Sequence, residues 1–225
     1  MAKFLEDKVV IVTGSGRGIG REIALLAGEL GAKVVVNDPG VNTDGSGSDL
    51  GPAEAVVSEI KAKGGTAVAN TDAVGTMDAG ENIIKTALDN FGKLDGLVNV
   101  AGILRDRMVF NMTEEEWDAV LNVHLKGAFN MARAAVEPML AQRYGRMLFF
   151  SSGSGLGSSG QANYSAAKEG MVGLARSLAR ELGPYGIAVN AIYPGGATRM
   201  TASVPSASRD LRARAGITGG SAAAQ

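Results

Sequence analysis

Short runs of β-branched residues alternate along most of the chain with longer segments whose apolar positions have helical spacing. Strands are predicted at 8–14, 32–38, 65–72, 94–102, 145–152 and 187–195. Helices are predicted at 18–30, 52–63, 77–91, 113–142 and 164–182. Several strands are apolar without alternation, as expected for strands that are buried on both faces of a parallel sheet. The pattern therefore predicts an α/β fold: a Rossmann-like, doubly wound parallel sheet of about six strands with flanking helices.

Charge and cysteine content exclude several classes of partner. The 225 residues carry a net charge of −1, so no basic field is available for nucleic acid or an acidic membrane surface. With no Cys and one His, neither a disulfide nor a thiolate metal site is expected, and no metal is predicted. The lack of Cys suits a reducing cytoplasm, which is the expected compartment. The N-terminal stretch MAKFLEDKVV carries charges ahead of a short apolar run, so neither a signal peptide nor a spanning helix is expected.

The segment TGSGRGIG, residues 13–20, lies where the first predicted strand passes into the first predicted helix. Gly14, Gly18 and Gly20 form a G-x-x-x-G-x-G pattern, which differs from the G-x-G-x-x-G fingerprint. A backbone without side chains can approach a pyrophosphate closely, and a helix N-terminus offers free N–H groups and a positive dipole end. Because the loop stands between a strand and a helix, it predicts dinucleotide binding, with Arg17 and Ile19 among the contacts.

Asp38 ends the second predicted strand and bears on the choice of dinucleotide. A carboxylate there accepts hydrogen bonds from the adenosine ribose hydroxyls and repels a 2′-phosphate, which favours NAD. Arg17 favours NADP, because a guanidinium in the glycine loop can pair with a 2′-phosphate. A simple turn-forming role ahead of Pro39 is the alternative for Asp38. Asp38 receives the greater weight, since placing a carboxylate beside a phosphate is costly, and NAD is predicted over NADP.

Tyr164 and Lys168 stand four residues apart at the start of a predicted helix, so their side chains share one face. A phenol, with an ordinary pKa near ~10, is a poor base at neutral pH. A neighbouring ammonium favours the phenolate and lowers its pKa, which makes proton exchange with an alcohol or ketone feasible. Taken alone, the pair is weak evidence, and a surface Tyr beside a solvated Lys is the alternative.

Several motifs occur together in the order and spacing of the short-chain dehydrogenases/reductases, which this chain resembles over roughly residues 5–200. They are TGSGRGIG, NVAG (99–102), the Ser-containing end of the fifth strand, YSAAK (164–168) and NAIYPGG (190–196). Within that family, the segments VVVND, GILRDRM, VHLKG, GQANYSAAK and TRMT resemble the (3R)-hydroxyacyl-CoA dehydrogenases of multifunctional enzymes. They resemble bacterial 3-oxoacyl-carrier-protein reductases to a lesser degree. The resemblance implies an NAD-dependent oxidoreductase that interconverts a secondary alcohol and a ketone, with a 3-hydroxyacyl-CoA and its 3-oxoacyl-CoA as the expected pair.

The resemblance also implies roles for matching residues. Tyr164 would be the general acid/base at the substrate oxygen, and Lys168 would bind the nicotinamide ribose and lower the pKa of the phenol. A strand-end Ser would hydrogen-bond the substrate oxygen and stabilise its developing charge. Further cofactor contacts are implied for Asp72, Asn99, Ala101, Gly102, Pro194 and Gly195.

Two serines compete for the strand-end position. Counting back thirteen residues from Tyr164, as is usual in the family, gives Ser151. Aligning the fifth strand from Gly145 gives Ser152, with one residue deleted in the loop GSGLGSSG. Adjacent strand residues point to opposite faces, so the two serines are not equivalent. Ser152 is the predicted catalytic residue.

The chain departs from the family pattern at three places. Val100 replaces the second Asn of Asn-Asn-Ala-Gly, and His124 stands where the family has an Asn that supports a proton-relay water. Relay support and an ordinary buried helix histidine both stay open for His124. The family's additional helix and seventh strand are missing from the predicted elements, which leaves the sixth strand as an exposed edge.

Residues 1–197 are therefore expected to form one dinucleotide-binding catalytic domain, and 198–225 its substrate loop and C-terminal tail. The expected partner is a small-molecule substrate such as an acyl-CoA, and the resemblance implies a homodimer or homotetramer. Two alternatives stay open: an NADPH-dependent reductase of 3-oxoacyl-carrier-protein or another ketone, and a truncated NAD-binding protein without turnover.

Overall fold

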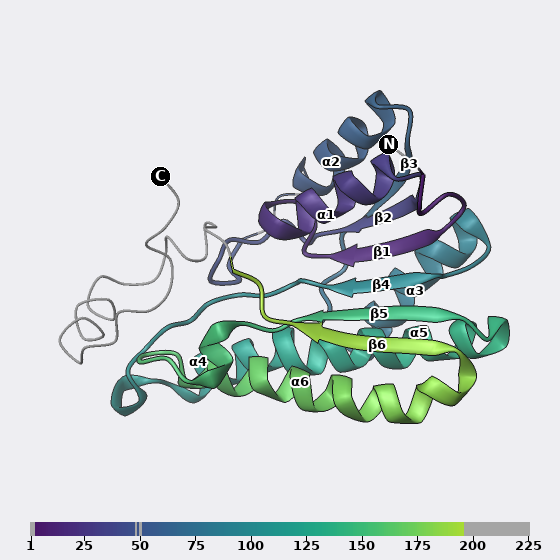
Figure 1. Cartoon of the computed structure of the whole chain (residues 1–225). Coiled ribbons are helices and arrows are strands. Elements are labelled where there is room, and N and C mark those ends of the chain that lie inside the picture. Colours follow the sequence, from purple (N-terminus) through teal and green to yellow (C-terminus); the bar gives the residue numbers. More distant parts are fainter. Residues whose placement is uncertain (1–2, 48, 50, 196–225) are drawn as a thin grey trace.

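A computed structural model of the chain describes residues 3–47, 49 and 51–195. These residues form a six-stranded parallel sheet with flanking helices, as the sequence predicts, and its strand order is β3-β2-β1-β4-β5-β6 (Figure 1). The strands are β1 (Val9–Thr13), β2 (Lys33–Asn37), β3 (Thr66–Asn70), β4 (Gly96–Asn99), β5 (Gly145–Phe150) and β6 (Ile187–Ile192). The strand order reverses between β1 and β4, and open α/β sheets bind ligands at the carboxyl ends of strands beside such a reversal.

Helices cover both faces of the sheet. The longer ones are α1 (Gly18–Glu29), α2 (Gly51–Ala62), α3 (Met77–Phe91), α4 (Glu114–Leu121), α5 (Gly127–Gln142) and α6 (Ala162–Leu182). Short turns are η1 (Val109–Asn111), η2 (Asn122–Lys126), η3 (Gly153–Leu156) and η4 (Gly183–Tyr185). One hydrophobic cluster joins the sheet to α1 and α2, and a second joins it to α3, α5 and α6. None of the helices in the described part of the chain is both long and apolar enough to cross a membrane.

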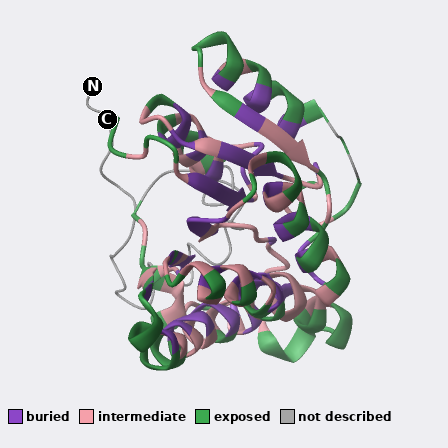
Figure 2. Cartoon of the chain, turned by 90° about the vertical axis from the view of Figure 1, so that its right-hand side faces the viewer, coloured by how far each residue is buried: buried purple, intermediate pink, exposed green. Residues whose placement is uncertain are grey.

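The buried core explains why the strands lack alternation. In β1, Val9 and Ile11 pack in the cluster with α3, α5 and α6, whereas Val10 and Val12 pack in the cluster with α1 and α2. All four side chains are buried, and Figure 2 shows buried segments along the sheet and the inner sides of the helices. A strand covered on both faces needs apolar residues at every position, as its sequence indicates.

The segment predicted as one helix over 113–142 is divided into three parts. α4 ends at Leu121, five residues form the π-helical segment η2, and α5 begins at Gly127. A π-helical segment widens the helix by one residue and is frequent at functional sites. His124 lies in this segment, which places the one histidine of the chain at a local distortion of the helix.

At the C-terminal end, β6 is the last strand of the described sheet and forms its edge. It ends at Ile192, three residues before the predicted end of that strand at 195. Pro194 and Gly195 follow it outside regular structure. The predicted substrate loop and tail at 198–225 lie outside the described residues.

Candidate active site

The loop after β1 brings backbone close to the end of β4. Gly14 has φ +65 and Gly18 φ +57, the left-handed region that favours glycine. A Cβ at Gly14 would lie 2.7 Å from the Cα of Ala101, so a larger residue would push the loop away. α1 begins at Gly18, and Arg17 at its N-cap makes no side-chain capping hydrogen bond. The first backbone N–H groups of α1 therefore have no side-chain acceptor from Arg17, and such free N–H groups at a helix N-terminus suit an anion.

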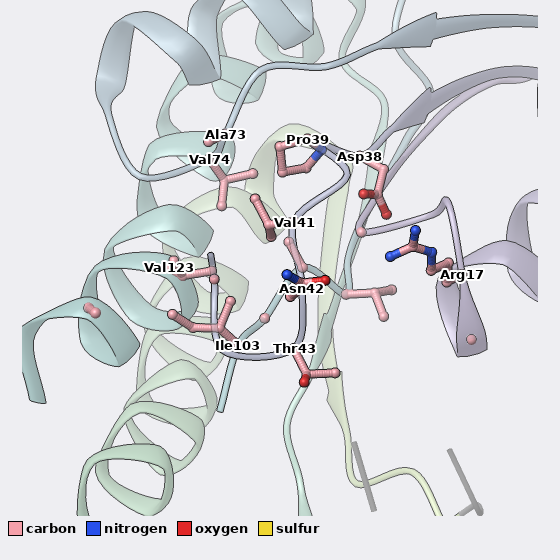
Figure 3. A pocket seen from close by; sticks show the side chains of 18 of the residues that line it. Arg17, Asp38, Pro39, Val41, Asn42, Thr43, Ala73, Val74, Ile103 and Val123 are labelled. Carbon is pink, nitrogen blue, oxygen red and sulfur yellow. The ribbon is translucent and has the colours of Figure 1, made fainter. Parts of the chain in front are cut away.

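A cavity of about 360 Å³ opens beside this loop, a size usual for cofactor and small-molecule sites (Figure 3). Predicted cofactor residues that line it are Gly14, Arg17, Gly18, Ile19, Gly20, Asp38, Ala101 and Gly102. They come from the glycine loop, from the segment after β2 and from the segment after β4. The doubly wound topology therefore brings these three separate parts of the sequence together at one crevice.

Asp38 and Arg17 both line this cavity, but each is held by a different partner (Figure 3). The two carboxylate oxygens of Asp38 accept backbone N–H hydrogen bonds, from Gly16 at 2.8 Å and from Gly40 at 2.7 Å. The guanidinium of Arg17 lies 3.4 Å from the carboxylate of Asp49. Backbone donors therefore hold the Asp38 side chain in place at the rim, while Arg17 is paired with Asp49.

Six other predicted cofactor residues are not among the described residues that line the cavity: Asp72, Asn99, Tyr164, Lys168, Pro194 and Gly195. Asn99 is buried at the end of β4, and its Nδ2 has no hydrogen-bond partner in the described structure. A buried amide of this kind ordinarily finds a partner in a ligand or a water. The Asp72 carboxylate accepts a hydrogen bond of 3.0 Å from the side chain of Asn70.

The three predicted catalytic residues, Ser152, Tyr164 and Lys168, are brought together between the end of β5 and the first turns of α6. The Ser152 hydroxyl lies near enough to the Tyr164 phenol to lower its pKa. The Nζ of Lys168 lies 5.5 Å from the centroid of the Tyr164 ring and donates a hydrogen bond of 2.6 Å to the carbonyl of Phe150. Tyr164 is thus flanked by a hydroxyl on one strand end and by an amine one helical turn along.

The two candidate serines have different partners. Ser151 is buried, and its hydroxyl donates a hydrogen bond of 2.9 Å to the backbone carbonyl of Lys168. Ser152 is only partly buried, caps η3 by accepting from the N–H of Ser154, and also reaches Tyr164. This geometry favours Ser152 for the substrate oxygen and gives Ser151 the task of tying β5 to α6.

Burial dominates the ionisation of Tyr164 and Lys168. It raises the pKa of Tyr164 above 10.0, against the opposing effect of the Ser152 hydrogen bond, and the charge of Asp106 raises it further. Burial also lowers the pKa of Lys168 from 10.5 to about 7. The sequence predicts a lowered pKa for Tyr164, and the described residues give the opposite direction. The reason is that both groups lose water together, and an amine with a pKa this low is only half charged near neutral pH.

A family model for the short chain dehydrogenases matches residues 8–209. The chain belongs to this family. Short-chain dehydrogenases are oxidoreductases that use a nicotinamide dinucleotide, and the cavity fits such a group on two observations. The Arg17 side chain does not cap α1, and the glycine loop passes close to Ala101. Directly before the cavity-lining Val100, the buried Nδ2 of Asn99 also lacks a partner in the described structure.

Individual relatives support the assignment. A Mycobacterium tuberculosis protein named as a short-chain type dehydrogenase/reductase is 54% identical over 202 residues, 89% of this chain and 70% of that protein. Mouse peroxisomal multifunctional enzyme type 2 is 50% identical over 200 residues, 88% of this chain and 27% of that enzyme. The 3-oxoacyl-[acyl-carrier-protein] reductase of Staphylococcus aureus is 47% identical over 189 residues, 84% of this chain and 74% of the reductase. The chain thus spans about a quarter of the mouse enzyme and most of the two bacterial proteins.

The fold agrees with that of a solved relative. A crystal structure of a short chain dehydrogenase from Mycobacterium avium superposes with a TM-score of 0.79 at 50% identity. The match covers 85% of this chain and 71% of that one. The six-stranded sheet described above is therefore the short-chain dehydrogenase sheet.

His124, the residue that departs from the short-chain dehydrogenase pattern, contacts the site directly. Its side chain is buried, its Nε2 lies 2.8 Å from the carbonyl oxygen of Ile103, and its Nδ1 has no partner in the described structure. Burial, and then the charge of Lys168, hold the pKa of His124 well below 6.5, so the imidazole is neutral at pH 7. The His124 ring also contacts the Tyr164 ring, with centroids 5.0 Å apart, and its role in a proton relay stays a prediction.

Sequence reasoning missed one wall of the cavity. Residues 40–47, here called the strap, run from Asp38 toward the segment after β4 (Figure 3). The N–H of Leu104 donates to the carbonyl of Thr43 at 2.7 Å, and Nε of Arg105 donates to the carbonyl of Asp44 at 2.9 Å. The sequence marks this segment only as Gly- and Ser-rich and loop-like, which carries no signal for the contacts it makes.

No group of three or more His, Cys, Asp and Glu side chains in residues 3–47, 49 and 51–195 is arranged to hold a metal ion. A second hollow lies at the exposed start of α4 and is lined by Glu114, Glu115, Asp118, Ala119 and Asn122. Among the described residues, Ser152, Tyr164 and Lys168 line neither this hollow nor the cavity beside the glycine loop.

Proposed function

We propose that the protein is an NAD-dependent oxidoreductase that interconverts a 3-hydroxyacyl-CoA and the corresponding 3-oxoacyl-CoA. The observation that carries the proposal is the arrangement of Ser152, Tyr164 and Lys168 at the end of β5 and the start of α6. Tyr164 packs in one hydrophobic cluster with Ile103, which lines the cavity that the glycine loop and Asp38 also line. Such an arrangement suits proton exchange at one oxygen and cofactor binding at the same time.

Different residues of the site would hold different parts of NAD. The glycine loop and the start of α1 suit the pyrophosphate, and Asp38 suits the adenosine ribose hydroxyls. Ala101, Gly102 and Lys168 would lie toward the nicotinamide end. When bound, the cofactor supplies the acceptor or donor for the hydride, and the protein supplies position and field.

The chain's own chemistry is proton transfer at the substrate oxygen. Tyr164 would accept the alcohol proton in oxidation and return it in reduction, while the hydroxyl of Ser152 donates a hydrogen bond to the same oxygen. Lys168, with a pKa of about 7, is poised to gain or lose a proton near neutral pH beside the phenol. A cation at Lys168 favours the phenolate and opposes the effect of burial on the pKa of Tyr164.

The preference for NAD over NADP is supported by the two charged residues at the rim. The Asp38 carboxylate would repel a 2′-phosphate, and Arg17 is already paired with Asp49. We expect the ratio of kcat/KM with NAD to kcat/KM with NADP to fall about 10- to 100-fold in Asp38→Ala, since a repulsive contact is removed. An unchanged ratio would contradict the role of Asp38.

The substrate class is supported by the motifs that the chain shares with (3R)-hydroxyacyl-CoA dehydrogenases and by its identity to the mouse multifunctional enzyme. The S. aureus relative is named for a 3-oxoacyl group on a carrier protein, which is also a thioester. An NADPH-dependent reductase of a carrier-protein thioester or another ketone is therefore the second candidate.

The deciding experiment measures turnover of purified protein with NAD⁺ and a (3R)-3-hydroxyacyl-CoA, and with NADPH and a 3-oxoacyl-carrier-protein. We expect turnover with the first pair and its loss in Tyr164→Phe, which keeps the ring and removes the proton carrier. Turnover only with the second pair would favour the carrier-protein reductase. Binding of NAD by calorimetry with no turnover on either pair would indicate a dinucleotide-binding protein without catalysis.

The proposed setting follows the sequence-based expectations. The lack of Cys supports a cytoplasmic location. The family resemblance supports a homodimer or homotetramer. The proposed partner is a small-molecule thioester. Size-exclusion chromatography with light scattering tests the oligomeric state directly.

A further inference from the structure

Asn163, directly before Tyr164, is fully buried and joins three separate segments. Its Nδ2 donates hydrogen bonds of 3.0 Å to the backbone carbonyls of both Arg105 and Glu116. Its Oδ1 accepts a hydrogen bond of 2.7 Å from the backbone N–H of Tyr164. The side chain is 0% exposed, so all three bonds form in a site where water does not compete.

The start of α6 depends on this side chain because its usual cap is occupied elsewhere. Gln161 is the N-cap of α6 and makes no side-chain capping bond, and its amide instead donates to Asp106 at 2.9 Å. The N–H of Tyr164 is one of the first helical N–H groups, which have no partner within the helix. Asn163 supplies that partner from inside the first turn.

The other two bonds of Asn163 reach the wall of the cavity. Arg105 lines the cavity and also bonds the strap, and Glu116 belongs to the first turn of α4. The same connection is reinforced nearby, since the N–H of Arg107 donates to the carbonyl of Gly160 at 2.8 Å. Asn163 therefore connects the backbone of Tyr164 to the cavity wall through a single planar amide.

We propose that Asn163 is a positioning residue, which fixes the phenol of Tyr164 relative to the cavity by clamping the Tyr164 backbone to Arg105 and to α4. The proposal rests on the function proposed above and adds to it the residue that sets the geometry of the acid/base. Its role is indirect: Asn163 touches the backbone of Tyr164, and Tyr164 meets the substrate. Placement matters because small displacements of a reacting group lower rates steeply.

The test compares two substitutions with a matched control. Asn163→Ala removes all three bonds, and Asn163→Asp keeps an acceptor for Tyr164 but loses both donors. Asn130→Ala is the control, because Asn130 is also buried and its Nδ2 donates a hydrogen bond of 2.9 Å to the Val74 carbonyl, outside the clamp. Turnover with NAD⁺ and a (3R)-3-hydroxyacyl-CoA, NAD binding by calorimetry and thermal stability are measured for each.

We expect kcat to fall about 10- to 100-fold in both Asn163 variants, with the Kd for NAD within about threefold of the parent. Asn130→Ala should lose thermal stability and keep kcat within about twofold once corrected for the folded fraction. Equal kcat losses in Asn163→Ala and Asn130→Ala would overturn the proposal, as would an Asn163→Ala protein with parental kcat.

A second readout does not depend on activity. The phenol of Tyr164 is titrated from ultraviolet difference spectra, each protein being compared with its own Tyr164→Phe counterpart. Because burial is the leading cause that raises the pKa of Tyr164, loosening the clamp in Asn163→Ala should lower that pKa toward 10.0. An unchanged phenol pKa would overturn the proposal.

The two readouts separate this inference from the function on which it rests. If the parent shows no turnover, the proposed function fails and the phenol titration alone decides the role of Asn163. If the parent is active, Tyr164→Phe is inactive and Asn163→Ala is fully active, only the role of Asn163 fails.

Discussion

The imidazole of His124 meets the phenol ring of Tyr164 edge-on, with ring centroids 5.0 Å apart and ring planes at 87°. The contact joins the π-helical segment η2 to the first turn of α6. Lys168 also acts on His124, because the charge of Lys168 is the second cause, after burial, that lowers the pKa of His124. Three titratable groups therefore share one buried space, and the ionisation of each affects the others.

The buried neutral His124 predicts a specific dependence of stability on pH. Its folded pKa lies well below the ordinary 6.5, so below about pH 6.5 the unfolded chain binds a proton that the folded chain does not. The free energy of unfolding should therefore fall by about 1.4 kcal/mol more in the parent than in His124→Asn between about pH 7.5 and about pH 5.5. Denaturant titrations at the two pH values measure the difference. Because the chain holds one His, the substitution removes its whole imidazole titration, and parallel pH dependences in the two proteins would contradict the prediction.

The buried amine of Lys168 is expected to lower the stability of the folded protein while it supports activity. Its pKa falls from 10.5 to about 7 on folding, so the folded state disfavours the charged amine that the unfolded chain carries at neutral pH. This cost is largest below about pH 7 and is relieved as the pH rises toward about 10.5. Lys168→Met should therefore be more stable than the parent by about 1–3 kcal/mol at pH 7, after allowance for the lost bond to Phe150.

Two measurements check this prediction. Denaturant unfolding should show the stability gain of Lys168→Met shrinking as the pH rises from about 7 to about 10. Turnover should be lost, since the amine beside Tyr164 is removed. A Lys168→Met protein that is less stable than the parent at neutral pH would show that the Phe150 hydrogen bond outweighs the cost of burying the amine.

The strands, the glycine loop and the shared helix face of Tyr164 and Lys168 are predictable because they follow from local patterns. β1 is apolar at every position, which indicates burial on both faces, and the glycine loop stands directly after it. The spacing of Tyr164 and Lys168 places them on one helix face whatever the rest of the fold does. These features depend on neighbours in sequence, so a single sequence contains them.

The remainder depends on contacts between distant segments. The π-helical segment at 122–126 has no composition that separates it from an α-helix, so the sequence predicts a single helix there. The direction of the Tyr164 pKa shift follows from burial that only the packed structure reveals. The clamp made by Asn163 and the cavity wall made by the strap likewise join residues about 50 to 60 positions apart, for which no local signal exists.

The two serines at the end of β5 should respond differently to truncation. Ser152→Ala removes the hydroxyl that reaches Tyr164 and should lower kcat/KM about 100-fold. Ser151→Ala breaks a buried hydrogen bond to the Lys168 carbonyl and should cost about 1 kcal/mol of stability with kcat/KM within about fivefold of the parent. Steady-state kinetics and thermal unfolding of the pair test this. A larger loss of turnover in Ser151→Ala would reverse the assignment.

Gly102 and His124 should be strongly coupled. A Cβ at Gly102 would lie 2.1 Å from Cε1 of His124, which is closer than any real contact, and the ring is buried and cannot move aside freely. Gly102→Ala should therefore destabilise the parent by about 1–3 kcal/mol through overpacking. In the background of His124→Ala, which removes the ring, the same substitution should cost less than about 0.5 kcal/mol. Denaturant unfolding of the four proteins gives the coupling energy, and additive losses would mean that the loop, rather than the imidazole, resists the added methyl group.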